Sequence, residues 1–146
     1  MTQRLQLILI FTLSMLFWTN VATAQDPERI KTITISADSA YTKVVQALQE
    51  SGYYIAQLDR SSGFIQTSVS LKSKSIFGRD GDKRIFNFLV VPLPDRRSKI
   101  ILNIFLFERL QAGSGNSGNY YYDDKGLVQD DKIYQQIWDK ILPLIQ

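Results

Sequence analysis

The side chains that this chain offers for chemistry are carboxylates, hydroxyls, tyrosines and cations, because its 146 residues include no histidine and no cysteine. Without these two residue types it cannot build a Ser-His-Asp or Cys-His nucleophile pair, a thiol redox centre, or an ordinary zinc or iron site. Paired carboxylates such as Asp123 and Asp124, a Ser-Lys pair or a tyrosine remain for catalysis. These residues form no recognisable catalytic pattern, so the sequence favours a non-enzymatic protein without a cofactor.

Two groups of residues resemble ligand-binding motifs without matching them. Asp80-Gly81-Asp82 and the later aspartates of 123–131 carry oxygen ligands suited to calcium, but neither group has the register of an EF-hand loop. Residues 113–118 read G-x-G-x-x-G, but no helix of a βαβ unit follows them. We expect no metal and no dinucleotide. Asp130 and Asp131 are assigned to the start of a helix, where the helix dipole favours acidic residues.

Candidate recognition residues stand in two segments. Tyr120, Tyr121 and Tyr122 follow a Gly/Ser/Asn-rich run and resemble the rigid, amphipathic contacts of recognition loops. The alternative is a short extra strand in which Tyr120 and Tyr122 pack inward. Phe77 and Arg79 stand among basic residues, a pattern that could contact an acidic partner or anionic lipid headgroups. A solvated loop of mixed charge is the alternative there.

Apolar periodicity predicts the elements that must position these residues. Residues 40–51 place Tyr41, Val44, Val45 and Leu48 on one helical face, and Gly52 then supplies a left-handed C′ position. The β-rich runs are 30–36, 53–58, 64–71, 84–93 and 99–107, and a second amphipathic helix covers 131–145. The runs 84–93 and 99–107 are apolar on both faces, which predicts central strands that are covered more completely than the others.

These elements predict an α+β fold: an antiparallel β-meander with two helices packed on one face, in the order β-α-β-β-β-β-α, similar to a helix-grip fold. Successive connections of a meander alternate between the two ends of the sheet. The short connections 59–63 and 94–98 therefore share one end, and the long ones, 73–83 and 108–129, share the other. Loops beyond about 12 residues without structure of their own are usually functional or disordered. We expect a recognition surface at the long-loop end.

Residues 1–24 read as a secretory signal peptide, with Arg4 first, an apolar run from Leu5 to Trp18, and small residues up to Ala24. The run is shorter than the about 20 apolar residues of a membrane span. We expect export to the periplasm, cleavage after Ala24 and one domain over 25–146, without a span after processing; an uncleaved signal anchor is the alternative. The leader carries one basic and no acidic residue, so its removal lowers the net charge from +3 to +2. That charge is too mild to support nucleic acid as a partner.

Residues 47–67 carry a resemblance to a known family. They contain a helix ending in an A-L-x-x-x-G step, a strand, the turn D-R-S-S-G and a second strand. This order resembles the opening of the helix-grip modules of the two-module periplasmic lipoprotein that belongs to the outer-membrane β-barrel assembly machine, and of related small envelope lipoproteins. The resemblance implies an exported, non-enzymatic module that works on partner proteins in the Gram-negative envelope. This chain has no cysteine to lipidate and only one module, so no functional residue is transferred.

Two functions follow as expectations. The first is the binding of a partner protein or another envelope component through the long loops, with peripheral membrane contact as one form of it. The alternative is the carriage of a small apolar ligand between helix and sheet. Phe86, Phe88, Phe105 and Phe107 could line such a pocket.

Overall fold

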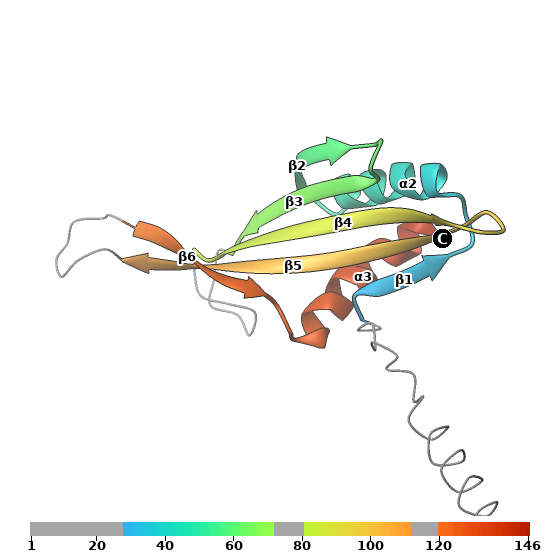
Figure 1. Ribbon diagram of the computed structural model, residues 1–146. Helices are drawn as coiled ribbons and strands as arrows, with labels where there is room; N and C mark the ends of the chain where they lie inside the picture. The colour runs from blue at the N-terminus through green and yellow to red at the C-terminus, as the bar shows by residue number, and fades with distance from the viewer. Residues whose placement is uncertain (1–27, 72–80, 112–119) are drawn as a thin grey trace, which may run out of the picture.

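The computed structural model describes residues 28–71, 81–111 and 120–146 (Figure 1). In chain order these residues form strand β1 (Ile30–Ile33), helix α2 (Ala37–Glu50), strands β2 (Tyr54–Asp59), β3 (Phe64–Ser70), β4 (Lys83–Leu93), β5 (Arg97–Gln111) and β6 (Tyr120–Leu127), and helix α3 (Asp131–Ile145). Neither helix of this described part is long and apolar enough to cross a membrane.

The six strands form one antiparallel sheet, in which β2 to β6 follow one another as a meander. β1 and β6 share one edge of β5, β1 pairing with residues 98–101 and β6 with residues 105–111. The pairing of β4 with β5 ends where Lys83 lies opposite Phe107. Beyond that point β5 pairs with β6, and the two strands extend past the rest of the sheet as a ribbon (Figure 1).

Helix α2 begins and ends at local sequence signals. The Ser36 hydroxyl accepts the backbone N–H of Ser39, which satisfies one of the free donors at the helix start. After the helix, Gly52 adopts φ +78°, and the N–H groups of Gly52 and Tyr53 donate to the carbonyls of Gln49 and Leu48. This pair of bonds is the Schellman motif that a glycine at C′ permits.

The β4–β5 connection turns on two residues in the left-handed region, Asp95 at φ 60° and Arg96 at φ 55°. Two positive φ values in succession are typical of a type I′ hairpin turn, whose twist matches that of the flanking strands. Pairing on both sides of the turn, from Leu93 with Arg97 onward, sets which side chains of β4 and β5 share a face.

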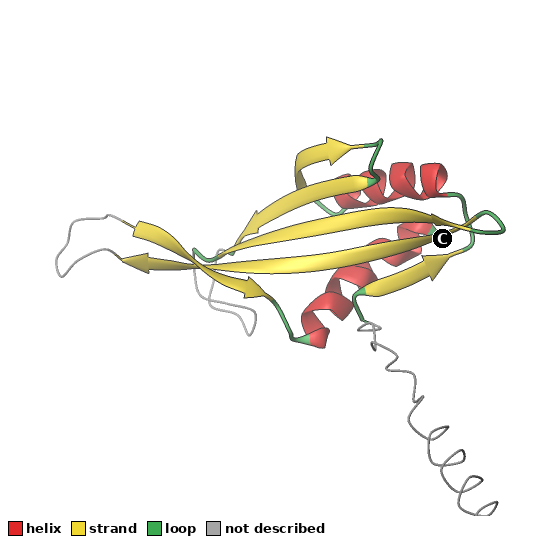
Figure 2. Ribbon diagram, viewed as in Figure 1, coloured by secondary structure: helices red, strands yellow, loops and turns green. Residues whose placement is uncertain are grey.

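Both helices pack on the same face of the sheet (Figure 2). On this face the ring of Trp138 packs edge-on against Phe88 at a centroid distance of 6.1 Å, and Tyr53 packs against Phe86 at 5.7 Å. The largest fully buried side chains are Trp138, Tyr134, Phe88, Leu48, Ile65, Ile100, Leu102, Ile104, Ile141, Ile145, Val44 and Thr67. The core therefore lies between the helices and one side of the sheet.

The predicted α+β class, with two helices on one face of an antiparallel meander, is confirmed. One expectation needs correction. The connection 108–129 contains the end of β5 and a further strand, β6, because the β5–β6 pairing continues past the helices. The runs 84–93 and 99–107 form the central strands β4 and β5, which are buried on the helix face and mostly half-buried on the other, and are covered more completely than β2, as expected. No described helix or strand lies over the other face, which we call the open face (Figure 2).

Candidate functional site: the tyrosine hairpin

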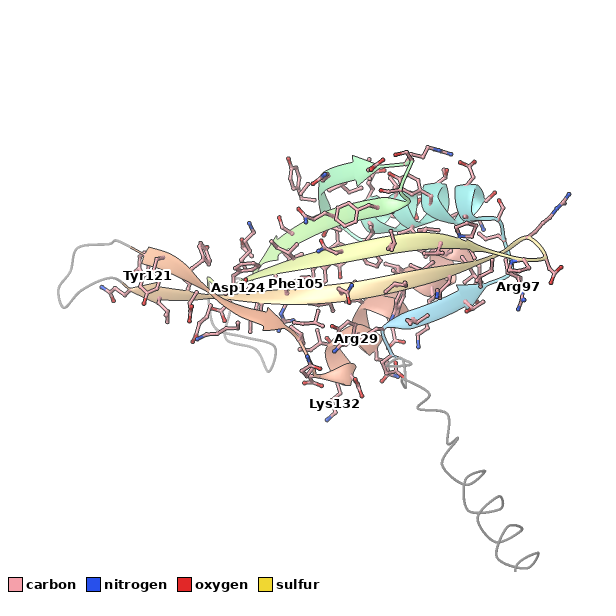
Figure 3. All side chains as sticks on the ribbon, in the orientation of Figure 1. Arg29, Arg97, Phe105, Tyr121, Asp124 and Lys132 are labelled. Carbon is pink, nitrogen blue, oxygen red and sulfur yellow. The ribbon has the colours of Figure 1, made fainter. Side chains whose placement is uncertain are left out.

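The β5–β6 ribbon carries the three tyrosines that the sequence singles out, and we call it the tyrosine hairpin (residues 107–111 and 120–125). Tyr120, Tyr121 and Tyr122 are 50%, 51% and 50% exposed, although all three lie in β6. Figure 3 places Tyr121 towards the outer end of the ribbon. The extra strand that was the alternative to a recognition loop is therefore present, but its rings do not pack into the core.

Alternation along β6 divides the tyrosines between two faces. Tyr122 pairs with Arg109 and Tyr120 with Gln111, so both continue the open face of the sheet. Tyr121 pairs with Leu110 and lies on the opposite side of the ribbon. The hairpin thus presents aromatic surface in two directions.

Arg109 fixes the aromatic side of the hairpin. Its guanidinium carbon lies 3.6 Å from the centroid of the Tyr120 ring, a cation–π contact. The Tyr122 hydroxyl donates to the carbonyl oxygen of Gly81 at 3.3 Å. Gly81 has φ +89°, and a Cβ there would stand 2.6 Å from Cδ of Arg109, so the glycine makes room for the arginine stem. These contacts order two of the three tyrosines before any partner arrives.

The base of the hairpin is held by a buried charge pair. Asp82 is 2% exposed and accepts the backbone N–H of Arg109 at 2.9 Å. Arg84 is 6% exposed; burial lowers the pKa of its guanidinium, and the carboxylates of Asp82 and Asp130 oppose that shift. Because Asp82 faces both a cation and a backbone donor, it links the end of the core to the hairpin.

The acidic residues of the hairpin do not converge. Asp123 lies opposite Glu108 on the helix side of the ribbon, whereas Asp124 lies opposite Phe107 on the open face. The Lys125 ammonium binds the Asp123 carboxylate at 2.6 Å and Glu108 at 3.1 Å, and hydrogen bonds to Asp123 and then Glu108 raise the pKa of Lys125. Asp124 accepts the backbone N–H of Gly126. Asp123 and Asp124 therefore cannot act as the carboxylate pair that the sequence offered.

The aspartates that the sequence assigned to a helix start, Asp130 and Asp131, lie at the start of α3. Asp130 is the N-cap of α3, where its carboxylate accepts the N–H of Lys132, and Asp131 lies in the first turn. Within residues 28–71, 81–111 and 120–146, no three acidic side chains are grouped to hold a metal ion. Phe77, Arg79, Asp80 and the glycine-rich run 113–118 lie outside the described residues.

The expected aromatic pocket of a carrier is not formed. Phe86 and Phe88 are buried under the helices, while Phe105 and Phe107 lie on the open face, so the four rings cannot line one cavity. The large side chains of α3, among them Trp138, fill the space between helix and sheet. A groove of about 380 Å³ lies instead at the edge of the sheet, between the end of β1 and the end of α3. Its lining residues are Thr32, Ile33, Thr34, Ile35, Ile145 and Gln146.

Sequence reasoning missed Arg109 and did not give Asp82 its anchoring role. The signal for Arg109 was an alternation that continues from Phe105 through Phe107 past the expected end of the strand. The signal for Asp82 was weaker, because an acidic residue just before a strand is usually part of a solvated turn.

The chain matches no protein-family model and no curated protein. Among solved structures it is similar to the crystal structure of a DUF4468 family protein from Bacteroides ovatus ATCC 8483, with a TM-score of 0.42 and 11% sequence identity. That similarity covers 80% of this chain and 84% of the other. A likeness of this size supports no conclusion about function.

Proposed function

We propose that this protein is an exported, non-catalytic envelope domain that binds a partner protein or another envelope component through the tyrosine hairpin. The observation that carries the proposal is the half-exposure of Tyr120, Tyr121 and Tyr122 on a ribbon that extends past the helices. Tyrosine combines a large apolar ring with a polar tip and is enriched where proteins bind one another.

The hairpin suits recognition because its tyrosines are ordered. Contacts with Arg109 and Gly81 hold the Tyr120 ring and the Tyr122 hydroxyl in place. An ordered aromatic side chain loses little conformational entropy on binding, so more of its contact energy is available for affinity. The likeness of residues 47–67 to envelope lipoprotein modules supports a protein partner, and the leader 1–24 supports export to the periplasm.

The binding experiment compares two tyrosine variants in a pull-down from envelope extract. The triple variant Tyr120→Ser, Tyr121→Ser, Tyr122→Ser should lose the proteins that the unmodified chain retains. Tyr54→Ser is the matched control, because Tyr54 is 74% exposed on β2, the strand at the opposite edge of the sheet from β6. Retention of the same proteins by the triple variant would overturn the proposal.

Two further measurements test the membrane-contact and export parts of this proposal. Co-sedimentation with vesicles of anionic lipid tests peripheral membrane contact, which should also depend on the tyrosine hairpin. Fractionation of a Gram-negative host, followed by intact mass, tests export: the expected product is periplasmic and begins at Gln25. A product that keeps residues 1–24 would favour the uncleaved signal anchor.

The carrier alternative now depends on the groove beside β1. Ile33, Ile35 and Ile145 give it an apolar side, and Thr32, Thr34 and Gln146 give it a polar one. A short acyl or isoprenoid chain matches that character. Native mass spectrometry of the protein from its host tests this alternative, since a carrier should retain such a molecule and Ile35→Asp, at a partly buried position of the same groove, should release it.

A further inference from the structure

Arg109 is enclosed by three residues of its surroundings in the tyrosine hairpin. Gly81 lies on the β4 side of it, where a Cβ would stand 2.7 Å from Nη1 of the arginine. Tyr122, directly opposite Arg109 in β6, reaches across β5 and donates its hydroxyl proton to the carbonyl oxygen of Gly81. The Tyr120 ring covers the guanidinium, with 3.6 Å between the ring centroid and the guanidinium carbon. The arginine is therefore held in one place before a ligand binds.

The guanidinium of Arg109 has no counter-ion within the part of the chain that the structure describes. Its side chain is half-buried, and the guanidinium interacts there with the Tyr120 ring alone. The nearby acidic residues each have another partner, and they are Asp82, Glu108, Asp123 and Asp124. A cation that is partly withdrawn from water and has no charged partner gains from binding an anion.

We propose that Arg109 receives a carboxylate from an acidic side chain of the partner protein. The inference rests on the proposed function of the tyrosine hairpin and adds the chemistry that the partner must carry. The planar guanidinium can donate two parallel N–H groups to the two oxygens of one carboxylate. The rings of Tyr120 and Tyr122 stand beside this position and offer contact to apolar residues next to the acidic one.

The charges around Arg109 favour a ligand with a single negative charge. Lys83 and Asp124 share the open face with Arg109, so two cations meet one carboxylate there and the net charge is +1. One carboxylate of a partner balances that charge. A phosphate group would instead bring a charge of about −1.5 to −2 at pH 7 to the neighbourhood of Asp124.

The helix side of the hairpin has the opposite balance of charge. Glu108 and Asp123 outnumber Lys125 there, which gives a net charge of −1. The charges of the two sides cancel, so the hairpin as a whole gains no net attraction to a surface of anionic lipid. An acidic protein segment that meets only the Arg109 side avoids the repulsion.

The test is an NMR titration of the purified protein with two capped peptides, acetyl-Gly-Phe-Glu-Phe-Gly-amide and the same peptide with glutamine in place of glutamate. The Nε–Hε signal of Arg109 and the amide signals of Tyr120 and Tyr122 report the contact. We expect dissociation of the glutamate peptide on the order of millimolar concentrations, since a short peptide makes few contacts. The glutamine peptide should bind at least about 10-fold more weakly, because it lacks the charge.

Variants assign the binding to Arg109. Arg109→Gln should remove the difference between the two peptides. Arg109→Lys keeps the charge but not the planar fork, and should bind the glutamate peptide more weakly than the unmodified protein does. Arg97→Gln is the matched control, because it removes the same charge from the other end of β5, where the Arg97 guanidinium lies 3.9 Å from the Asp95 carboxylate. It should leave the titration unchanged.

Three results of the titration would overturn the inference. One is equal binding of the two peptides by the unmodified protein, a comparison that requires no variant to fold. Another is a preference for the glutamate peptide that survives in Arg109→Gln, since the carboxylate would then bind elsewhere. The third is a larger response of the Arg109 Nε–Hε signal to inorganic phosphate, or to vesicles of anionic lipid, than to acetate at equal ionic strength.

The pull-down from envelope extract separates this inference from the proposed function. Arg109→Gln should lose the proteins that the triple tyrosine variant loses. If Arg109→Gln retains proteins that the triple variant loses, the carboxylate contact is wrong and the proposed function stands. If both variants retain them, the proposed function is wrong, and the peptide titration still decides whether Arg109 binds a carboxylate.

Discussion

The carboxylate of Asp82 accepts the backbone N–H of Arg109, with 2.9 Å between Oδ1 and N. Asp82 directly precedes Lys83, the first residue of β4, and Arg109 lies two residues beyond Phe107, the last residue of β5 that pairs with β4. In a paired strand, a carbonyl of the neighbouring strand would receive this N–H. Here a buried side chain replaces the missing strand and so lets the ribbon leave the sheet without an orphaned donor.

Asp82 places a charge beside Arg84 and accepts the Arg109 N–H, and two replacements distinguish these roles. Asp82→Ala and Asp82→Asn both remove the charge beside buried Arg84, and each should lower the free energy of unfolding, by about 3 kcal/mol for alanine. Asparagine retains an oxygen that can accept the Arg109 N–H, so only Asp82→Ala should speed hydrogen exchange at that amide. Urea unfolding and exchange measured by NMR check the two effects.

The exchange comparison decides whether Asp82 anchors the hairpin. Asp139→Ala, a change of an exposed aspartate on α3, should leave both measurements nearly unchanged. Equal protection of the Arg109 amide in Asp82→Ala and Asp82→Asn would show that the hydrogen bond does not hold the ribbon.

Two glycines with nearly equal backbone angles should respond differently to a side chain. Gly52 has φ +78° and Gly63 has φ +74°, so an alanine at either position costs about 1 kcal/mol in backbone strain. A Cβ at Gly52 meets open space, whereas one at Gly63 would overlap the backbone carbonyl oxygen of Val90. Gly63→Ala should therefore lower the free energy of unfolding by clearly more than Gly52→Ala.

Chemical denaturation of the two variants measures this difference. Gly52→Val tests the same C′ position more severely, because a β-branched residue resists positive φ. An unchanged melting temperature for Gly52→Val would contradict the Schellman assignment. Equal losses for the two alanine variants would mean that the strand backbone at Val90 moves aside freely.

The segment 47–67 could be predicted well because its signals are local. Gly52 and Gly63 each need a conformation that few other residues adopt, and the alternation after Gly63 assigns Ile65 and Thr67 to the core, where both are fully buried. Such features do not depend on distant contacts. The same reasoning located α3, whose bounds match the predicted 131–145.

The tyrosine hairpin could not be predicted in the same way. Burial creates the alternation that identifies a strand, and Tyr120, Tyr121 and Tyr122 are equally exposed on a two-stranded ribbon. The placement of the phenylalanines failed for another reason. Whether Phe88 and Phe105 share a face depends on the number of residues between the paired ends of β4 and β5, and the three residues Pro94-Asp95-Arg96 carry no turn pattern that would reveal that number.

The turn residue Asp59 should titrate well below an ordinary aspartate. Hydrogen bonds from the Ser61 hydroxyl, then the Ser62 hydroxyl, then backbone N–H groups of the turn favour the ionised carboxylate and lower its pKa from 3.8 to about 2. Because the folded pKa is the lower one, the turn gains stability from Asp59 above pH 3.8 and loses it as the pH falls towards 2. An NMR titration of the side-chain carbon measures this.

Serine variants test the cause of that shift. Ser61→Ala should raise the pKa of Asp59 more than Ser62→Ala does, since the Ser61 hydroxyl makes the larger contribution. Ser68→Ala, in β3 outside the turn, should leave the titration unchanged. A titration midpoint near 3.8 in the unmodified protein would mean that the turn does not hold the two hydroxyls on the carboxylate.

A single hydrogen-bond donor on helix α3 should hold the segment that leads into β1. The Trp138 indole N–H donates to the backbone carbonyl of Glu28 at 2.6 Å, and its ring packs against Phe88. Trp138→Phe removes that donor and leaves a small cavity. The two effects together should lower the free energy of unfolding by about 2 kcal/mol. The loss should also speed hydrogen exchange in β1, the first strand of the described chain.

Tyr134→Phe is the matched change one helical turn away. Its hydroxyl donates to the carbonyl of Val128 at 2.9 Å and accepts the backbone N–H of Ile104 at 3.4 Å, so the variant removes two hydrogen bonds near the junction of β6 and α3 and leaves the packing nearly intact. We expect the free energy of unfolding to fall by about 2 kcal/mol, with unchanged exchange in β1. If both variants speed exchange in β1 equally, the effect reflects general loss of stability. If only Trp138→Phe does so, the indole bond to Glu28 is what fixes the first strand against the helix.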